Sequence, residues 1–330
     1  MKIIVYGVKP DELAYFEAWQ KTHDQPLSLH SELLDEKTVA WARGFDGVNC
    51  LQTTPYSAAV FAQLAEFGIH FLTIRNVGLD NLDLAAAKQN KIRIANVPAY
   101  SPSAIAEFAV TMTLYLLRRL GETRAPLAAG HWNQAASFLG RELGQSTVGV
   151  VGAGRIGQAA IRLFAGFGAN VLAYDPHPGH PEPRATYVSL KQLLAESDVV
   201  DLHVPGIPAN DHLIDDAALT LMKQNAVLIN TARGNLVDTT ALLKHLRAGH
   251  LGGAGIDTYE HESPALLRYE QTGKFTDPQW EELAQLPNVL LTPHVAYHTE
   301  TAVENMVNFS LANLVRFLTK GEAPDEIMIK

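Results

Sequence analysis

Residues 147–164 constrain the fold of this chain more than any other part of the sequence. A short β-prone run, Thr147–Val151, leads into the glycine-rich segment GAGRIG at residues 152–157 and then into a helical pattern that extends to Phe164. Glycines at this spacing allow a tight turn and let a pyrophosphate approach the amides at the start of the helix. The segment therefore predicts a dinucleotide-binding site, with an ordinary glycine-rich turn as the alternative.

The next β-prone run supplies the acidic residue expected in such a site. It covers residues 171–174 and ends directly before Asp175. A carboxylate at this place accepts hydrogen bonds from both ribose hydroxyls and repels a 2′-phosphate, which favours NAD over NADP.

Short apolar runs alternate with helical patterns along the chain. This alternation is typical of parallel sheets covered by helices on both faces, so we expect an α/β fold with two doubly wound domains. The first series of β-prone runs covers residues 3–6, 47–51, 70–74 and 92–95, and the second covers 147–151, 171–174, 199–203, 226–230, 253–256 and 289–292.

The glycine-rich segment begins well inside the chain, which predicts another domain before it. A helix is expected to begin at Ser101-Pro102 and to end near Gly121, followed by a polar connection around residues 130–133. The last helix, after Thr299, has no strand of its own and is expected to pack on the first domain. We predict a substrate domain of residues 1–100 and 299–330 and an NAD-binding domain of residues 101–298.

The composition disfavours several classes of partner. With 26 Lys and Arg against 35 Asp and Glu in 330 residues, the formal net charge is −9, which disfavours nucleic acid and anionic membranes. The apolar run at the N-terminus is too short for a signal peptide, and no stretch reaches the roughly 20 apolar residues of a membrane helix. The one cysteine, Cys50, can form no internal disulfide. We therefore expect a cytoplasmic protein.

Polar side chains with complementary chemistry follow three runs of the second series. Arg233 follows the fourth run, Glu262 the fifth and His294 the sixth, and the carboxyl ends of parallel strands meet at one edge of a sheet. Reduction of a 2-oxo acid needs a cation that binds the carboxylate, as Arg233 can, and a proton donor such as His294. Glu262 would orient the imidazole and favour its protonated form. The alternatives are that Arg233 is a surface cation, that Glu262 is a solvated loop acid, and that His294 is an ordinary member of the 13 histidines in the chain.

The other histidines receive simpler interpretations. His203, His261 and His294 lack the spacing of a metal site, so we expect no metal. His212 lies in a polar loop sequence and is interpreted as an ordinary loop residue.

Together, these residues resemble the NAD-dependent D-2-hydroxyacid dehydrogenase family along essentially the whole chain. Besides the glycine-rich segment, the resemblance rests on RNVGLDN at residues 75–81, NVPAYSP at 96–102, NTARG at 230–234, DTYEHE at 257–262 and TPH at 292–294. Within the family, the sequence is most similar to the D-lactate and D-2-hydroxyisocaproate dehydrogenases of lactobacilli.

The resemblance implies a fold, an activity and a set of site residues. The expected fold is a Rossmann NAD-binding domain inserted into a discontinuous flavodoxin-like substrate domain. His294 is implied as the acid/base, Glu262 as its partner and Arg233 as the substrate anchor. Homodimers joined through the nucleotide domains are implied, as is a cleft that closes on binding. The cofactor-binding residues indicated by the motif and the resemblance are Gly152, Gly154, Arg155, Ile156, Gly157, Asp175, Val204, Pro205, Asn210, Thr231, Ala232, Arg233 and Asp257.

One position departs from the D-lactate dehydrogenases of this group, which tend to have tyrosine where Leu51 stands. A smaller apolar side chain leaves room for a larger substrate tail, so we expect branched or aromatic 2-oxo acids to be preferred over pyruvate. The alternatives are a D-lactate dehydrogenase acting mainly on pyruvate, a hydroxypyruvate or glyoxylate reductase, and a nicotinamide-sensing binding protein. The expected substrate-binding residues are Leu51, Val77, Gly78, Tyr100, Arg233 and Tyr297, with Met306 as a further candidate.

Overall fold

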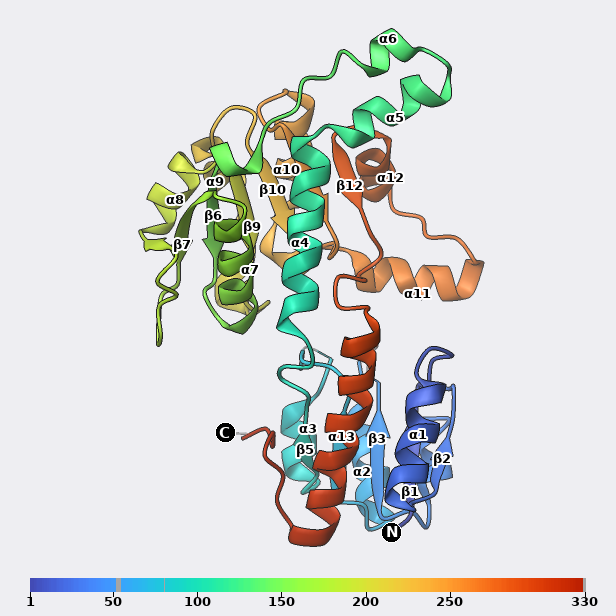
Figure 1. The fold of residues 1–330 in the computed structure, drawn as a ribbon. Helices are drawn as coiled ribbons and strands as arrows, with labels where there is room; N and C mark the ends of the chain where they lie inside the picture. The colour runs from blue at the N-terminus through green and yellow to red at the C-terminus, as the bar shows by residue number, and fades with distance from the viewer. Residues whose placement is uncertain (52–54, 80, 329–330) are drawn as a thin grey trace. The chain divides into compact units, whose positions relative to one another are not determined.

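The computed structural model describes residues 1–51, 55–79 and 81–328, which form two compact units (Figure 1). Unit 1 consists of Met1–Ser101 and His298–Lys330, and unit 2 of Pro102–Tyr297. Each boundary lies one residue from the predicted one. Both units are built on sheets in which the named strands pair in parallel, so the predicted α/β class is confirmed.

Unit 1 has a five-stranded sheet in the order β2-β1-β3-β4-β5, which is the flavodoxin-like order. Its strands are β1 (Ile3–Tyr6), β2 (Leu27–Leu29), β3 (Gly47–Cys50), β4 (Phe71–Ile74) and β5 (Arg93–Ala95). Helices α1 (Leu13–His23) and α13 (Glu300–Lys320) cover one face, and η1 (Val39–Ala42), α2 (Ala58–Glu66) and α3 (Leu84–Gln89) cover the other.

The alternation of side chains along β1 explains why both faces are covered. Ile3 and Val5 point to the face of α1 and α13, while Ile4 and Tyr6 join the core beneath α2. The apolar stripe of α13 completes the first of these cores, in the position expected for the last helix.

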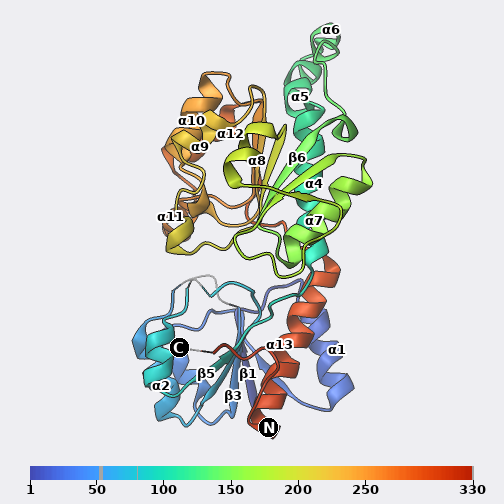
Figure 2. The ribbon, with the colours of Figure 1, turned by 90° about the vertical axis from the view of Figure 1, so that its left-hand side faces the viewer.

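Unit 2 has a seven-stranded sheet in the order β12-β11-β10-β9-β6-β7-β8. Figure 2 shows this unit with helices on either side of its strands. Its strands are β6 (Thr147–Val151), β7 (Asn170–Tyr174), β8 (Thr186–Tyr187), β9 (Val199–Leu202), β10 (Val227–Asn230), β11 (Gly253–Ile256) and β12 (Val289–Leu291). From β6 the chain adds β7 and β8 on one side, and then it crosses to add β9 and the later strands on the other side. Ligands bind beyond the carboxyl ends of the strands at such a switch point in the strand order. The glycine-rich segment follows β6 at this place.

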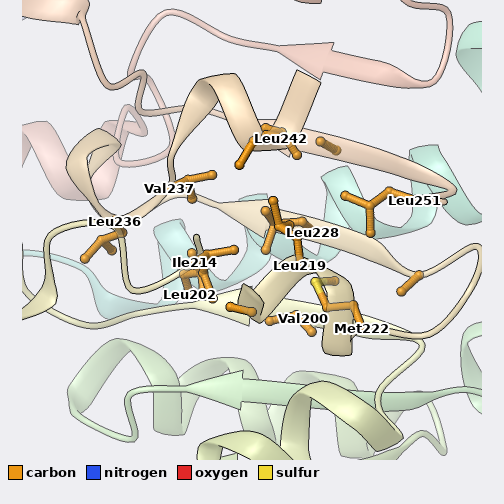
Figure 3. Close-up of a cluster of buried hydrophobic side chains, with 14 of the residues drawn as sticks. Val200, Leu202, Ile214, Leu219, Met222, Leu228, Leu236, Val237, Leu242 and Leu251 are labelled. Atoms are coloured by element: carbon orange, nitrogen blue, oxygen red, sulfur yellow. The ribbon is translucent and has the colours of Figure 1, made fainter. Parts of the chain in front are cut away.

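Helices pack on both faces of the sheet of unit 2. On one face α4 (Pro102–Leu117) and α7 (Arg155–Gly166) enclose a core that includes Val150 and Ile229. On the other face Leu228 packs among side chains of the opposite helix layer, and Figure 3 shows this core. The helices of this second layer are α8 (Leu190–Glu196), α9 (Asp216–Leu221), α10 (Thr239–Arg247) and α12 (Pro278–Gln285).

Several predicted elements need correction. The strands at one edge of each sheet, β2 and β8, were not predicted, because runs of three and two residues carry no recognisable pattern. The helix from Pro102 ends at Leu117 and not near Gly121, since Arg119 has a left-handed backbone with φ of 54°. A further helix that was not predicted, α5 (Leu120–Ala128), precedes the connection predicted around residues 130–133, α6 (Trp132–Ala135) begins inside that connection, and η2 (Leu143–Gln145) follows. Among the described residues, no helix has the length and apolar character that a membrane span requires.

A buried ion pair organises the carboxyl ends of three strands in unit 1. Arg75 is fully buried, and its Nε donates to Glu12 Oε1 at 2.8 Å. Its Nη1 donates to Asn49 Oδ1 and its Nη2 to the carbonyl of Gly7, both at 2.8 Å. The guanidinium is thereby satisfied in an environment where an unpaired charge is costly.

We predict that Glu12→Gln lowers the free energy of unfolding by about 3 kcal/mol or more, because the charge of buried Arg75 loses its counter-ion. The matched control is Glu282→Gln, which removes the partner of exposed Arg247 and is expected to cost less than about 1 kcal/mol. Urea unfolding monitored by circular dichroism measures both, and equal losses would contradict the prediction.

Candidate active site

The glycine-rich segment has the geometry of a phosphate cradle. Gly152 has φ of 96°, and a Cβ on it would lie 2.7 Å from the backbone of His203. A Cβ on Gly157 would lie 1.9 Å from the carbonyl oxygen of Gly152. By contrast, a Cβ on Gly154, directly before α7, would meet no atom within 4 Å. The backbone therefore leaves open space at the start of α7, where helix amides attract a phosphate.

Three further residues of the predicted cofactor site lie at or beside this turn. Asp175 follows β7, and its Oδ2 accepts a hydrogen bond from the amide of Ala153 at 2.9 Å. The carboxylate is thus held beside the glycine-rich turn, as recognition of a ribose requires. Arg155 is exposed and Ile156 is half-buried in the first turn of α7. These residues fit a dinucleotide.

A second predicted cofactor segment follows β9. Val204 is buried and Pro205 exposed, and Asn210 Nδ2 donates to the carbonyl of Pro205 at 2.9 Å. This bond closes the loop, which includes the short helix η3 (Pro208–Asn210).

The loop after β10 presents Arg233. Asn230 fixes the turn, since its Nδ2 donates to the carbonyl of Arg233 at 2.9 Å and its Oδ1 accepts from the amide of Ala232 at 3.1 Å. Gly234 begins η4 (Gly234–Leu236), and a Cβ on it would lie 2.2 Å from the backbone of Tyr259. The loops after β10 and β11 are therefore in direct contact. The hydroxyl of buried Thr231 has no hydrogen-bond partner among the described residues.

Asp257, at the end of β11, holds the turn that carries His294. Asp257 is 2% exposed, and its Oδ1 accepts hydrogen bonds from the hydroxyl of Thr292 at 2.5 Å and from the amide of Val295 at 2.9 Å. Its Oδ2 accepts from the amide of Ala296 at 2.9 Å. The amide of His294 donates to the carbonyl of Asp257, also at 2.9 Å. These bonds fix His294 in a left-handed conformation with φ of 55°, which non-glycine residues adopt uncommonly.

The structure brings Glu262 and His294 together. His294 Nδ1 lies 3.0 Å from Glu262 Oε1, and the two side chains are 41% and 26% exposed. Glu262 is the first residue of α11 (Glu262–Thr272), where the helix dipole favours a carboxylate. Because Nδ1 faces Glu262, Nε2 is the nitrogen that can exchange a proton with a substrate.

The candidates in unit 1 lie beyond the carboxyl ends of its strands. Leu51 is buried directly after β3, and the half-buried Val77 and Gly78 follow β4. The carbonyl of Val77 accepts from Asn96 Nδ2 at 2.7 Å, which fixes this turn.

Tyr100 and Met306 are also in unit 1. Tyr100 is half-buried, and its carbonyl accepts from Asn305 Nδ2 at 2.7 Å. Met306 is 4% exposed on α13. Tyr297 is half-buried at the last position of unit 2. Residues 52–54 and Asp80, which belong to the motifs used in the sequence analysis, lie outside the described residues.

Sequence reasoning missed polar contacts around the candidate site. His203, interpreted as an ordinary residue, has Nε2 at 2.7 Å from Asp201 Oδ2, and both side chains are at most 1% exposed. The two residues are two positions apart on one extended segment, so their side chains lie on the same face. This spacing could have indicated the pair. His212 and Glu260 also pair, at 2.6 Å, but they are too far apart in the sequence for any local signal. Within residues 1–51, 55–79 and 81–328, no three His, Cys, Asp or Glu side chains are grouped as metal ligands.

Comparisons with known proteins find similar sequences along the whole chain. A family described as "D-isomer specific 2-hydroxyacid dehydrogenase, NAD binding domain" matches residues 110–296. A D-2-hydroxyacid dehydrogenase (NAD+) of Lacticaseibacillus paracasei is 59% identical over 330 residues, which cover 99% of this chain and 98% of the relative. A D-lactate/D-glycerate dehydrogenase of Pediococcus acidilactici is 42% identical over 329 residues, with 99% of each chain covered.

A solved structure of a D-2-hydroxyisocaproate dehydrogenase superposes with a TM-score of 0.95. It is 59% identical in sequence, and the match covers 99% of each chain. The similarity thus extends over both units.

We predict that Asp257→Asn lowers the free energy of unfolding by about 1–3 kcal/mol, because an amide cannot accept all the hydrogen bonds from the buried turn. Thr292→Val is the matched control, since it removes one donor and leaves both amide bonds to Asp257 intact. Chemical unfolding of the two variants measures the difference. A smaller loss for Asp257→Asn than for Thr292→Val would show that the carboxylate does not fix the turn.

Proposed function

The chain belongs to the D-isomer-specific 2-hydroxyacid dehydrogenase family, and we propose on that basis that His294 is its acid/base catalyst and that it acts best on 2-oxo acids with branched or aromatic side chains. As a member of this family it is an NAD-dependent D-2-hydroxyacid dehydrogenase whose substrates are 2-oxo or 2-hydroxy acids. The observation that carries the role of His294 is its contact with Glu262 from a turn held by Asp257.

Three side chains of unit 2 account for the proposed chemistry. The bound cofactor supplies the hydride. Arg233 binds the substrate carboxylate through its planar guanidinium and polarises the neighbouring carbonyl. His294 donates a proton from Nε2 to the carbonyl oxygen during reduction and accepts it during oxidation. Glu262 accepts a hydrogen bond from Nδ1 of His294 and keeps the ring oriented.

The other candidate residues complete this proposal. In unit 1, the amides of Val77 and Gly78 bind a carboxylate oxygen of the substrate, and Leu51 and Tyr100 contact its side chain. In unit 2, the turn at residues 152–157 binds the pyrophosphate, and Asp175 binds the ribose hydroxyls. Unit 1 is then the substrate domain and unit 2 the NAD-binding domain.

The substrate preference is supported by Leu51 and by the relatives. Leucine is smaller than the tyrosine expected at this position in D-lactate dehydrogenases, so a longer substrate side chain has more room. The similar solved structure is that of a D-2-hydroxyisocaproate dehydrogenase, and its 59% identity exceeds the 42% of the D-lactate/D-glycerate dehydrogenase. Pyruvate as the main substrate is the second candidate.

The role of His294 is tested by His294→Ala. We expect turnover of NADH with a 2-oxo acid to fall by about 10²–10⁴-fold, because the proton donor is lost, while the affinity for NADH is retained. Steady-state rates and NADH fluorescence titration measure the two effects. His70→Ala, on the exposed surface of unit 1, serves as the control and should leave both unchanged. Retained turnover in His294→Ala would contradict the assignment.

The substrate preference is tested by comparing kcat/KM for 2-oxoisocaproate, phenylpyruvate and pyruvate. We expect at least about a tenfold advantage for the larger acids, since each extra methylene in an apolar pocket contributes roughly 1–3 kcal/mol. Leu51→Tyr should shift the ratio toward pyruvate, whereas Leu51→Met, of similar volume, should leave it nearly unchanged. A clear preference of the wild-type enzyme for pyruvate would overturn the proposal.

We also propose that the chain forms a homodimer and that it is located in the cytoplasm. The dimer is supported by exposed apolar side chains on and after α5 and α6, which extend away from the sheet of unit 2 (Figure 1). No side chain of α5 is buried, and Trp132 and Leu139 are 71% and 86% exposed. A second copy of the chain would cover these residues.

The cytoplasmic location is supported by the single buried cysteine, Cys50, which fits a reducing compartment.

Light scattering coupled to size-exclusion chromatography tests the dimer. We expect a particle of twice the chain mass of 36.0 kDa, and dissociation in the double variant Trp132→Glu, Leu139→Glu, because two charges would be buried at the interface. Leu13→Glu, which changes an exposed leucine of unit 1, is the control. A wild-type particle with the mass of one chain would disprove the dimer.

A further inference from the structure

The loop after β9, residues 204–212, packs directly against the residues that present Arg233. A Cβ on Gly206 would lie 2.8 Å from Cγ of Arg233 and 2.8 Å from Oδ1 of Asn235. Cγ belongs to the stem of the Arg233 side chain, and Cβ of Arg233 lies at 3.0 Å, so the loop packs against the part of the side chain that positions the guanidinium. The position of this loop and the position of the proposed substrate anchor are therefore linked by contact.

His212 fastens the far end of the loop to the same neighbours. Its backbone has φ of 50°, and its amide donates to the carbonyl of Asn235 at 2.8 Å. Its ring Nε2 lies 2.6 Å from Oε1 of Glu260. This end of the loop is thus held by the backbone bond to Asn235, by the ion pair between His212 and Glu260, and by a hydrogen bond from Asn235 Nδ2 to Asp211 Oδ1.

Glu260 joins three segments at one carboxylate. Oε1 pairs with His212, and Oε2 accepts a hydrogen bond from the amide of Thr239, the first residue of α10, at 2.9 Å. Glu260 itself lies two positions before Glu262, in the loop after β11. Through Glu260, the loop of residues 204–212 is connected to the segment that carries the partner of His294.

The charges around His212 are mainly negative. Glu260 faces it directly, Asp211 precedes it, and Asp238 lies at the N-terminus of α10, while His261 is 3.9 Å from the carboxylate of Glu260. The hydrogen bond with Glu260 raises the pKa of His212, and the nearby carboxylates act in the same direction. The ion pair is therefore present below that pKa and is replaced by a weaker neutral hydrogen bond above it.

We propose that His212 and Glu260 are positioning residues that hold the cofactor loop, residues 204–212, against the loops of Arg233 and Glu262, so that the charge on His212 controls the affinity for NADH. This inference rests on the proposed function, because it takes residues 204, 205 and 210 to contact the cofactor. His212 itself touches neither substrate nor cofactor in the proposal. Its effect should fall on the KM for NADH far more than on kcat.

The test measures NADH affinity by fluorescence titration and the KM for NADH from pH 6 to pH 9.5, with a saturating 2-oxo acid. For the wild-type enzyme we expect the affinity to weaken about three- to fivefold as His212 loses its proton, the range of an exposed ion pair. His212→Gln, which keeps a donor without the charge, should show the weak affinity already at pH 6 and no further change. His212→Lys, which stays charged across this range, should keep the tight affinity to about pH 9.

Lys244→Gln is the matched control, since it breaks an exposed ion pair with Asp216 elsewhere in unit 2 and should behave as wild type. The proposal is overturned if His212→Gln shows the same pH dependence as wild type, or if His212→Lys loses affinity with pH as wild type does. If the wild-type enzyme neither binds NADH nor reduces any 2-oxo acid, the proposed function fails together with the inference. If the wild-type enzyme turns over normally and the His212 variants have the same NADH affinity and pH dependence as wild type, the inference is rejected and the proposed function stands.

Discussion

The carboxylate of Asp257 is the interaction on which the candidate active site depends. It is buried, yet both of its oxygens accept hydrogen bonds from the segment Thr292–Ala296. A buried carboxylate is tolerated only where donors replace its water, and here two of the donors are backbone amides. The same contacts hold His294 in a left-handed conformation and present its ring to Glu262. The resemblance implies that Asp257 contacts the cofactor, which stays a prediction, and its observed contacts also make it the support of the proposed catalytic histidine.

The parallel sheet of unit 2 explains why residues distant in sequence can act together. Loops that follow β6, β9, β10, β11 and β12 leave the same edge, and close backbone contacts lock several of them together. Gly206 lies against Arg233, and Gly234 lies against Tyr259. A chain with a net charge of −9 can still bind an anionic cofactor and an anionic substrate, because the amides at the start of α7 and the guanidinium of Arg233 are local sources of positive potential.

The sequence predicted those parts of the molecule that have a local pattern. The glycine-rich turn, the apolar central strands and the apolar stripe of α13 depend on residues close together in the chain, and each has a recognisable period or spacing. The edge strands β2 and β8 have none, because they are short and partly exposed. The break between α4 and α5 depends on a left-handed Arg119, a conformation that no composition rule indicates.

The same distinction applies to the candidate site. Arg233, Glu262 and His294 could be predicted because each follows a strand-like run, and the structure shows Glu262 beside His294. The supporting contacts could not be predicted, since Asp257 pairs mainly with backbone amides, and Glu260 with a histidine in a separate loop. A hydrogen bond to a backbone amide does not depend on the side chain of the residue that donates it, so the sequence does not indicate such contacts.

We propose that these loops direct hydride and proton to a 2-oxo acid so that a D-2-hydroxy acid forms. The most direct measurement supplies NADH that carries two deuterium atoms at C4, together with 2-oxoisocaproate, and analyses the product by chiral chromatography and mass spectrometry. We predict D-2-hydroxyisocaproate with one deuterium at C2, since the hydride passes directly from the cofactor to the carbonyl carbon. The L-enantiomer, or a product without deuterium at C2, would contradict the claim.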